Sequence, residues 1–414
     1  MTDGEPTIRA ATPDDWPAVA ALLRRAYHGP EDPEYAELDR AVYEPARGLV
    51  VADAGEVVGH AVALTRDLTV PGAVVPAAHV TNVAVAPTHR RRGLLSRLMR
   101  RQLQELHDAG REPFAVLWAS EGRIYWRYGY GSAAPRHSLT IDLREVQLHP
   151  DWQRPGGAAG RLRAGDPVDL RKDMAAVYER LRPDRPGWSS RSDAWWRFIL
   201  ADTIPGRDGF GARRAAVVDG EDGPRGYAVW RTRRGWVRNG PGGEVQINAV
   251  LAVDPAAYAA LWGLLLGIDL AATAAFWFGA VDEPLQYLVP EPSRLGAVAL
   301  DSLWVRPVDV PAMLAARRYA RDVDVVIDVT DPLLPANTGR WRLTGGPAGA
   351  TCERTAAPAD LACGVAELGA VYLGGPSLAA LAAAGRVGEL RPGALRPASD
   401  AFGWHRPPSS IEIF

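Results

Sequence analysis

The sequence predicts an α+β protein in which mixed central sheets are flanked by helices, arranged as three domains over residues 1–150, 151–299 and 300–414. Three observations lead to this prediction. A strand, a basic turn and an amphipathic helix follow one another over residues 80–106. The elements around that unit are partly repeated between residues 160 and 262. The chain has 414 residues, more than one ordinary core requires, and a third pattern begins near residue 300.

A change of hydrophobic period defines the first unit. Val83 and Val85 alternate with smaller residues in an apolar run that Pro87 ends, which is typical of a strand. After Gly93 the apolar residues recur three or four apart, as on one face of a helix, and Gly110 provides a stop. The residues of that face are Leu94, Leu95, Leu98, Met99, Leu103 and Leu106.

The turn between this strand and helix is basic. Arg90, Arg91 and Arg92 stand directly before Gly93. The start of a helix leaves about four backbone N–H groups unpaired and carries roughly half a positive charge. Gly93 lets the backbone approach a ligand closely. We interpret the turn as a cradle for an anion such as a pyrophosphate, and a solvated basic turn is the alternative.

The residues before this unit predict a strand at 8–10, a helix beginning near Thr12, and three strands at 49–53, 57–69 and 73–87. A further strand is expected at residues 114–118, followed by a short helix and by a strand that begins near Tyr130. The order of elements in this region is therefore β-α-β-β-β-α-β-α-β.

Residues 29–44 contain six acidic side chains. They form either a solvated acidic loop and helix or one wall of a site for cationic molecules. In the second interpretation, Glu31 and Asp32 are candidate substrate-binding residues.

The second region begins after a predicted linker at residues 155–157 and echoes the first. Its strand at residues 246–253 ends before Pro255, as the earlier strand ends before Pro87. The arginines and the glycine are missing after Pro255, so this copy should be a degenerate domain without the anion cradle.

The third region is expected to begin with a strand around Trp304 that runs into a helix holding Leu314 and Tyr319. Strands are then predicted at 324–330, 339–343 and 349–353, and helices at 365–373, 377–384 and 398–404.

The composition excludes several classes of protein. Lys and Arg total 47 and Asp and Glu 49, so nothing indicates nucleic acid as a partner. Cys352 and Cys363, the only cysteines, provide neither a disulfide framework nor a four-ligand zinc site, and no metal cluster stands out among the eight histidines. The polar, acidic N-terminus does not resemble a signal peptide, so we expect a cytoplasmic protein, with secretion left open.

The apolar residues 258–281 are long enough to suggest a membrane span. Asp269 stands near their middle, where a charge costs about 2.5–3.5 kcal/mol on insertion scales. We therefore expect a buried helix, a turn at residues 267–269 and a buried strand around Trp277.

Two motifs carry a resemblance to a known family. Residues 83–95 read VAVAPTHRRRGLL, residues 119–131 read ASEGRIYWRYGYG, and the chain ends at Phe414. This order resembles the GCN5-related N-acetyltransferases, the GNAT superfamily. In that superfamily a small residue usually stands where this chain has Leu95. The enhanced-intracellular-survival (Eis) family shares this departure, and the chain resembles that family over its full length.

The resemblance implies tandem GNAT folds followed by a domain like sterol carrier proteins, assembled as a homohexamer. It also implies transfer of acetyl from acetyl-CoA, without a metal, to primary amines of small molecules such as aminoglycosides or polyamines. Two alternatives remain open: acetylation of protein lysines or N-termini, and a lipid or ligand carrier that is not an enzyme. A nucleophilic hydrolase is disfavoured because the sequence has no G-x-S-x-G motif.

The resemblance also implies the roles of individual residues. Tyr125 would be the general acid, and the terminal carboxylate of Phe414 the general base. Residues expected to bind acetyl-CoA are Val83, Ala84, Val85, Arg90, Arg91, Arg92, Gly93, Leu94, Leu95, Ser96, Ser120 and Glu121. The alternative for Phe414 is a disordered end. The tail alternates apolar and acidic residues, so we expect Ile411 and Ile413 to face inward and Glu412 to add negative charge near the acceptor.

Overall fold

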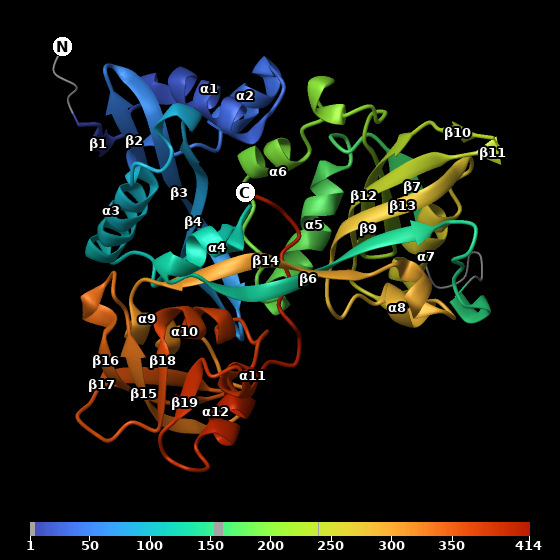
Figure 1. The fold of residues 1–414 in the computed structure, drawn as a ribbon. Helices are drawn as coiled ribbons and strands as arrows, with labels where there is room; N and C mark the ends of the chain where they lie inside the picture. The colour runs from blue at the N-terminus through green and yellow to red at the C-terminus, as the bar shows by residue number, and fades with distance from the viewer. Residues whose placement is uncertain (1–4, 153–159, 239) are drawn as a thin grey trace.

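The computed structural model describes residues 5–152, 160–238 and 240–414 (Figure 1). The linker predicted at residues 155–157 lies outside the described residues. One large sheet joins the first two regions, and a smaller sheet forms the third.

The large sheet has twelve strands. Their bounds are β1 (Thr7–Ala10), β2 (Gly48–Asp53), β3 (Glu56–Val70), β4 (Ala73–Val85), β5 (Phe114–Trp118), β6 (Gly131–Asp142), β7 (Arg161–Gly165), β8 (Arg214–Gly220), β9 (Gly223–Arg233), β12 (Gly243–Ala252), β13 (Ala271–Gly279) and β14 (Val298–Pro307). The strands lie in the order β1-β2-β3-β4-β5-β14-β6-β13-β12-β9-β8-β7. A separate hairpin, β10 (Trp236–Val237) and β11 (Gly240–Pro241), extends beyond this sheet.

Each half of the large sheet carries its own helices. They are α1 (Trp16–Tyr27), α2 (Pro33–Arg40), α3 (Leu94–Ala109) and α4 (Gly122–Tyr125) in the first half, and α5 (Arg171–Leu181), α6 (Asp193–Ile199), α7 (Pro255–Leu266) and α8 (Leu285–Leu288) in the second. Helix α1 packs on β3 and β4, and α3 packs on β2, β3 and β4. In the second half, α5 packs on β9, and α7 packs on β8, β9 and β12.

The two halves share strands at their junction. Strand β6 pairs with β13 of the second half through residues 137–142. Strand β14 pairs with β5 and β6. The strand around Trp304, which the sequence assigned to the third region, therefore lies in the middle of the large sheet. The following helix, α9 (Val310–Ala315), ends before Tyr319, which is nevertheless buried.

The third region has a five-stranded sheet in the order β17-β16-β15-β18-β19. Its remaining elements are β15 (Val323–Thr330), β16 (Gly339–Gly346), β17 (Gly349–Arg354), β18 (Leu361–Gly364), α10 (Val365–Val371), α11 (Leu378–Ala383), β19 (Val387–Glu389) and α12 (Leu395–Phe402). The short strands β18 and β19 were not predicted. Helix α10 lies almost directly on the backbone of the large sheet, because a Cβ at Gly131 would stand 1.9 Å from the Ala366 carbonyl oxygen. A Cβ at Gly369 would stand 2.2 Å from the Val305 oxygen.

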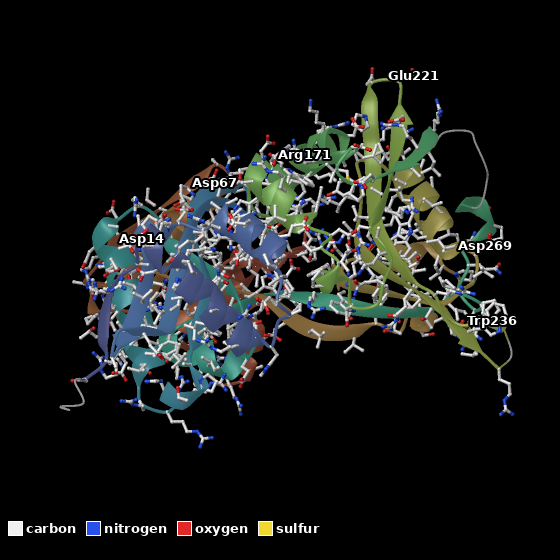
Figure 2. The ribbon with its side chains drawn as sticks, turned by 90° about the horizontal axis from the view of Figure 1, so that it is seen from above. Asp14, Asp67, Arg171, Glu221, Trp236 and Asp269 are labelled. Carbon is white, nitrogen blue, oxygen red and sulfur yellow. The ribbon has the colours of Figure 1, made fainter. Side chains whose placement is uncertain are left out.

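The apolar stretch after residue 255 is a helix and a strand, as predicted, but the strand is not buried throughout, because Trp277 is 51% exposed. Helix α7 is followed by β13, and Asp269 lies exposed in the turn between them. Figure 2 shows Asp269 at the periphery of the second half, on the opposite side of the molecule from Asp14. Among the helices of the described residues, none is long and apolar enough to cross a membrane.

The C-terminal tail returns to the middle of the molecule and ends between the two halves of the large sheet (Figure 1). Trp118 Nε1 donates a hydrogen bond to Ser410 Oγ at 2.9 Å, and Trp188 Nε1 donates to Ser409 Oγ at 3.0 Å. Since Trp118 belongs to the first half and Trp188 to the second, the tail is anchored to both. The alternative of a disordered end at Phe414 is therefore wrong.

Candidate active site

Strands β4 and β5 diverge where the predicted site begins. They are parallel neighbours, but they pair only at Ala78 with Ala115 and at His79 with Val116. Strand β4 continues to Val85. Beyond His79 its backbone groups on that side are therefore not used by β5 and can bind a ligand.

A bulge in β4 accompanies this divergence. Asn82 has a left-handed φ of 53°, and the register between β3 and β4 shifts near Ala61. His60 Nδ1 donates to the Asn82 carbonyl at 2.9 Å, and Tyr43 lies 3.1 Å from its Nε2. Burial lowers the pKa of His60 to about 4, so the ring is neutral and Nε2 accepts from the Tyr43 hydroxyl. This bond supports the bulge from the side of β3.

A cavity of about 650 Å³ opens beside the diverging end of β4. We call it the cradle cavity. The predicted residues that line it are Val83, Ala84, Val85, Arg90, Arg91, Gly93, Leu94, Leu95, Ser96, Ser120, Glu121 and Tyr125. Arg92 does not line it and lies instead 3.8 Å from Asp53. Tyr27 and Tyr128, which the sequence did not single out as binding residues, contribute to its walls.

The basic turn has the backbone of an anion cradle. Arg91 and Gly93 both adopt left-handed conformations, with φ of 63° and 77°. Gly93 is the N-cap of α3, and no side chain caps this helix start. The first N–H groups of α3 are therefore left for a ligand. A Cβ at Gly93 would meet nothing within 4 Å, so the glycine is needed for its φ.

The corresponding turn of the second half has no such cradle. Helix α7 starts after Asp254, whose side chain accepts a hydrogen bond from the Ala257 N–H at 3.0 Å. Asp254 also pairs with Arg225 at 2.7 Å. The helix start is thus already satisfied by a carboxylate of the chain, which leaves no free N–H groups for a phosphate.

A second cavity, of about 520 Å³, adjoins the first. We call it the aromatic cavity. Its aromatic lining consists of Tyr27, Tyr35, Trp118, Tyr125, Trp195, Phe198 and Phe414. Tyr27, Val83, Ser120 and Tyr125 line both cavities. Tyr125 is only 7% exposed, and burial raises the pKa of its hydroxyl above the ordinary range. This side chain therefore stands protonated at the junction of the two cavities.

The chain terminus lies in the aromatic cavity. One terminal oxygen of Phe414 accepts a hydrogen bond from Thr81 Oγ1 at 2.6 Å. The Phe414 ring packs edge-on against His79 at 4.6 Å between ring centroids. His79 is fully buried, and burial lowers its pKa to about 3, so it is a neutral packing residue. The structure thus brings the Phe414 carboxylate and Tyr125 to the walls of one cavity.

Asp39 contributes the one acidic side chain among the residues that line the aromatic cavity. Burial raises the pKa of its carboxyl to about 6, although a hydrogen bond from Asn82 opposes the shift. Asp39 lies on α2, within the acidic stretch, and the sequence analysis did not prefer it over its neighbours. Asp39 follows Tyr35 by four residues, so both lie on one face of α2, and this spacing could have singled it out.

The acidic residues that the sequence favoured lie elsewhere. Glu31 and Asp32 line a neighbouring cavity of about 560 Å³, which shares Tyr27, Tyr35 and Asp39 with the aromatic cavity. Asp32 caps α2 by accepting from the Tyr35 N–H at 3.0 Å, and it also binds the Thr203 hydroxyl.

The tail corrects the prediction for Glu412. Its carboxylate is buried and pairs with Arg66 and, at 2.7 Å, with Arg191. Ile413, expected inside, is 58% exposed. Ile411, by contrast, is partly buried against the core of the second half, as expected. The buried guanidinium groups of Arg66 and Arg191 need a counter-ion, so Glu412 lies inside in place of Ile413.

The described residues contain no group of three or more His, Cys, Asp and Glu side chains that could hold a metal. His89 pairs with Asp53 at 2.9 Å, and His405 is exposed.

Three family models match the chain. An acetyltransferase (GNAT) domain matches residues 7–133, another acetyltransferase (GNAT) domain matches residues 187–307, and a sterol carrier protein domain matches residues 310–410. The N-acetyltransferase Eis of Mycobacterium tuberculosis is 36% identical over 410 residues, which cover 96% of each chain. An uncharacterized N-acetyltransferase of Streptomyces avermitilis is 44% identical over 397 residues, or 95% of this chain and 96% of that protein.

Solved structures agree with these matches. The crystal structure of Eis1 from Mycobacterium abscessus superimposes with a TM-score of 0.82 at 32% identity, over 99% of this chain and 100% of that chain. A GCN5-related N-acetyltransferase from Anabaena variabilis, at 19% identity, has the same fold with a TM-score of 0.84. GNAT domains use acetyl-CoA, and the cradle cavity with its uncapped helix start fits that cosubstrate. The α+β fold with two GNAT domains and a sterol-carrier-like domain is confirmed, and the chain belongs to the Eis family of N-acetyltransferases.

Proposed function

We propose that this N-acetyltransferase transfers acetyl from acetyl-CoA to primary amines of polycationic small molecules such as aminoglycosides or polyamines. The observation that carries the proposal is that Tyr125 lines both the cradle cavity and the aromatic cavity. An amine in the aromatic cavity would meet a thioester held by the cradle cavity at this side chain. Attack would then be direct, in a ternary complex and without an acyl-enzyme.

Two groups would move the protons. An alkylammonium has a pKa near 10 and must lose a proton before it attacks, and the terminal carboxylate of Phe414 would accept it. Thr81 would hold that carboxylate in place through its hydroxyl. Tyr125, which burial keeps protonated, would donate to the departing thiolate, whose unperturbed pKa is about 8.5. A backbone N–H at the end of β4 would stabilise the tetrahedral oxyanion.

The lining of the aromatic cavity supports a cationic acceptor. Asp39 provides negative charge, and Tyr27, Tyr35 and Phe198 present aromatic rings that attract ammonium groups. A long polyamine would also reach Glu31 in the adjoining cavity, which shares Tyr27 and Tyr35 with this one. Glu412, by contrast, would act on the acceptor only by holding the tail in place.

We also propose how the whole chain is organised. Residues 1–150 would carry the acetyl-CoA cradle and Tyr125, and residues 151–299 a degenerate copy. The carrier-like domain would lie within residues 300–414, after β14, and the tail would return Phe414 to the site. The protein would assemble as a cytoplasmic homohexamer, and both its cysteines are free thiols. Exposed apolar side chains of the second half support contacts between copies, among them Trp236, 70% exposed, which Figure 2 shows at the end of the hairpin. Size-exclusion chromatography with light scattering tests the hexamer.

Thiol release from acetyl-CoA tests the reaction. The acceptors would be aminoglycosides, polyamines and lysine peptides, each tested with the full chain and with a chain that lacks Phe414. Phe414→Ala is the matched control, because it removes the ring and keeps the terminal carboxylate. We expect turnover on the small polycations, loss of kcat on deletion, and a smaller loss in the alanine variant.

The other outcomes separate the alternatives. Faster turnover on lysine peptides than on small amines would indicate a protein acetyltransferase. Binding of an apolar ligand without turnover on any amine would indicate a carrier. Full turnover after deletion of Phe414 would mean that another residue is the general base. Asp39, the acidic side chain that lines the aromatic cavity, would then be the next candidate.

A further inference from the structure

A fourth cavity lies on the second half of the large sheet, next to the aromatic cavity. It has a volume of about 360 Å³ and is bounded by β9, β12, the end of α6 and the tail. Tyr35, Phe198 and Ile413 line both this cavity and the aromatic cavity. We call it the arginine cavity, because Arg191, Arg213 and Arg231 line it.

Two of these arginines have no acidic partner. Within residues 5–152, 160–238 and 240–414, no carboxylate lies at ion-pair distance from Arg213 or Arg231. Nearby arginines do have one, since Arg207 lies 3.0 Å from Asp202. Arg213 and Arg231 are both partly buried. Arginines that are removed even partly from water usually have an acidic partner, so two neighbouring guanidinium groups without one are unusual.

The surrounding charges do not restore the balance. Arg191 shares the single carboxylate of Glu412 with Arg66. The only other acidic side chain among the lining residues is Asp208. Burial lowers the pKa of both Arg213 and Arg231, and for Arg213 the charge of Arg231 adds to this effect. The carboxylate of Asp202 opposes the shift of both arginines, and that of Asp208 opposes the shift of Arg231, without reversing either one. The cavity therefore carries an excess of positive charge, which an anion would neutralise.

The hydrogen bonds of these arginines hold them in place and leave donors for a ligand. Arg213 Nη1 donates to the Ile199 carbonyl at 2.6 Å, while its Nε is buried without a partner. Arg231 Nε donates to Gln246 Oε1 at 2.6 Å, and Nη1 donates to the Gly206 carbonyl at 3.1 Å. The buried Nε of Arg213 is out of reach of a ligand. Each guanidinium has five N–H donors, so Nη N–H groups of both arginines remain for a ligand, as does the Gln246 amide N–H group.

We infer that the arginine cavity binds an oxyanion, a carboxylate or a phosphate, between Arg213 and Arg231. The planar guanidinium fork matches these two groups in geometry and charge. The oxyanion is either a separate molecule or the acidic end of an amine whose other end lies in the aromatic cavity. The second source rests on the proposed function, whereas the first does not.

The aromatic cavity and the arginine cavity meet at Tyr35, whose hydroxyl is influenced by the charges of both Asp39 and Arg213. The pKa of the Tyr35 hydroxyl is raised to about 12, mainly by burial and also by the charge of Asp39, while the charge of Arg213 opposes this rise. Tyr35 thus faces a carboxylate from the aromatic cavity and a guanidinium from the arginine cavity. An acceptor with an ammonium at one end and a carboxylate at the other would match this arrangement.

Calorimetric titration of the full chain with inorganic phosphate and with glutarate tests the site directly. We expect both to bind, with affinity at least about tenfold lower in Arg231→Gln, because one hydrogen bond between charged groups contributes about 1.5–3 kcal/mol. Arg214→Gln is the matched control, since Arg214 is exposed and adjacent to Arg213. Glutaramide, the uncharged counterpart of glutarate, should not bind. Circular dichroism verifies that each variant is folded, and Arg213→Lys provides a second variant that keeps the charge but loses the fork.

The acceptor assay identifies the source of the anion. Putrescine and γ-aminobutyrate have similar lengths and differ in whether the far end is an ammonium or a carboxylate. A selective loss of γ-aminobutyrate acetylation in Arg231→Gln, with putrescine unchanged, would place the acidic end of the acceptor in this cavity. Binding of phosphate that requires Arg231 without such a loss would indicate a separate anion.

The inference is overturned if neither anion binds wild type more tightly than Arg231→Gln and neither amine distinguishes the two proteins. Absence of turnover on every amine would contradict the proposed function alone, because the titrations with phosphate and glutarate do not depend on catalysis.

Discussion

Replacing Glu412 with glutamine should release the end of the chain from the aromatic cavity. The carboxylate binds Arg66 and Arg191, whose side chains are 2% and 5% exposed. Glu412→Gln keeps the shape of the side chain and removes the charge, so two buried guanidinium groups lose their counter-ion. Removing one partner of a buried ion pair costs about 3–5 kcal/mol, and the glutamine oxygen retains one hydrogen bond, so we expect about 3 kcal/mol.

This free energy corresponds to a shift of about a hundredfold in the docking equilibrium of the tail. Carboxypeptidase digestion measures that equilibrium, because the enzyme cleaves only the undocked end and redocking is fast. Phenylalanine should therefore be released about a hundredfold faster from Glu412→Gln than from wild type. Glu353→Gln, which removes an exposed carboxylate in the third region, should release it at the wild-type rate.

Equal rates of phenylalanine release from Glu412→Gln and from wild type would refute this account of the tail.

The same variant should lose kcat for amines while its KM for acetyl-CoA stays unchanged, because the cradle cavity belongs to β4 and α3. Burial alone would raise the pKa of Glu412, but Arg191 and Arg66 outweigh it and lower the pKa. Its contribution to stability is therefore present above the ordinary pKa of glutamate and is lost as the pH falls through the lowered value.

Three further predictions concern the site itself. Tyr125→Phe should lower kcat by about 10²–10⁴-fold, the range typical of general acids, with little change in the KM for acetyl-CoA. Arg91→Gln should raise that KM by about tenfold, whereas Arg92→Gln should change it less than about twofold, because only Arg91 lines the cradle cavity. For Asp39, whose pKa is about 6, kcat/KM for diamines should fall as the pH drops through that value, and Asp39→Asn should abolish this dependence. The folded-state pKa of Asp39 is raised, so ionisation costs stability above about pH 6, and Asp39→Asn should raise the unfolding temperature more at pH 8 than at pH 5.

Each of these predictions has a contradicting result. An unchanged kcat in Tyr125→Phe would show that Tyr125 is not the general acid. Equal effects of Arg91→Gln and Arg92→Gln on the KM would mean that the turn acts by net charge rather than by the positions of its side chains. A pH profile for diamines that persists in Asp39→Asn would assign the titration to another group, of which the terminal carboxylate of Phe414 is the nearest candidate.

Within the site, prediction succeeded where the determinants are local. The strand, the basic turn and the start of α3 follow from alternating valines, a glycine with φ of 77° and a helix without a capping side chain. The same reasoning identified the second copy as one without a cradle, where Asp254 occupies the corresponding helix start. In both cases the relevant contacts join residues a few positions apart.

Prediction failed where a residue's role depends on a distant segment. Acidic charge alone does not distinguish Asp39 from its neighbours in the sequence. Only the packing of α2 against α6 places Asp39 on the wall of the aromatic cavity. The orientation of Glu412 depends on Arg66, 346 residues earlier in the chain. In the sequence, Arg213 and Arg231 cannot be distinguished from ordinary surface arginines. Only the folded chain brings them together with the tail around one cavity.

The sequence by itself determined most element types, the position of the basic turn and the family, because helix periods, strand alternation and helix-start chemistry are set by neighbouring residues. Only the tertiary structure decided that β14 lies between β5 and β6, that Glu412 faces inward, and that three cavities share Tyr35. These outcomes depend on the burial and charge of residues far apart in the chain, whose balance is fixed only when all segments pack together.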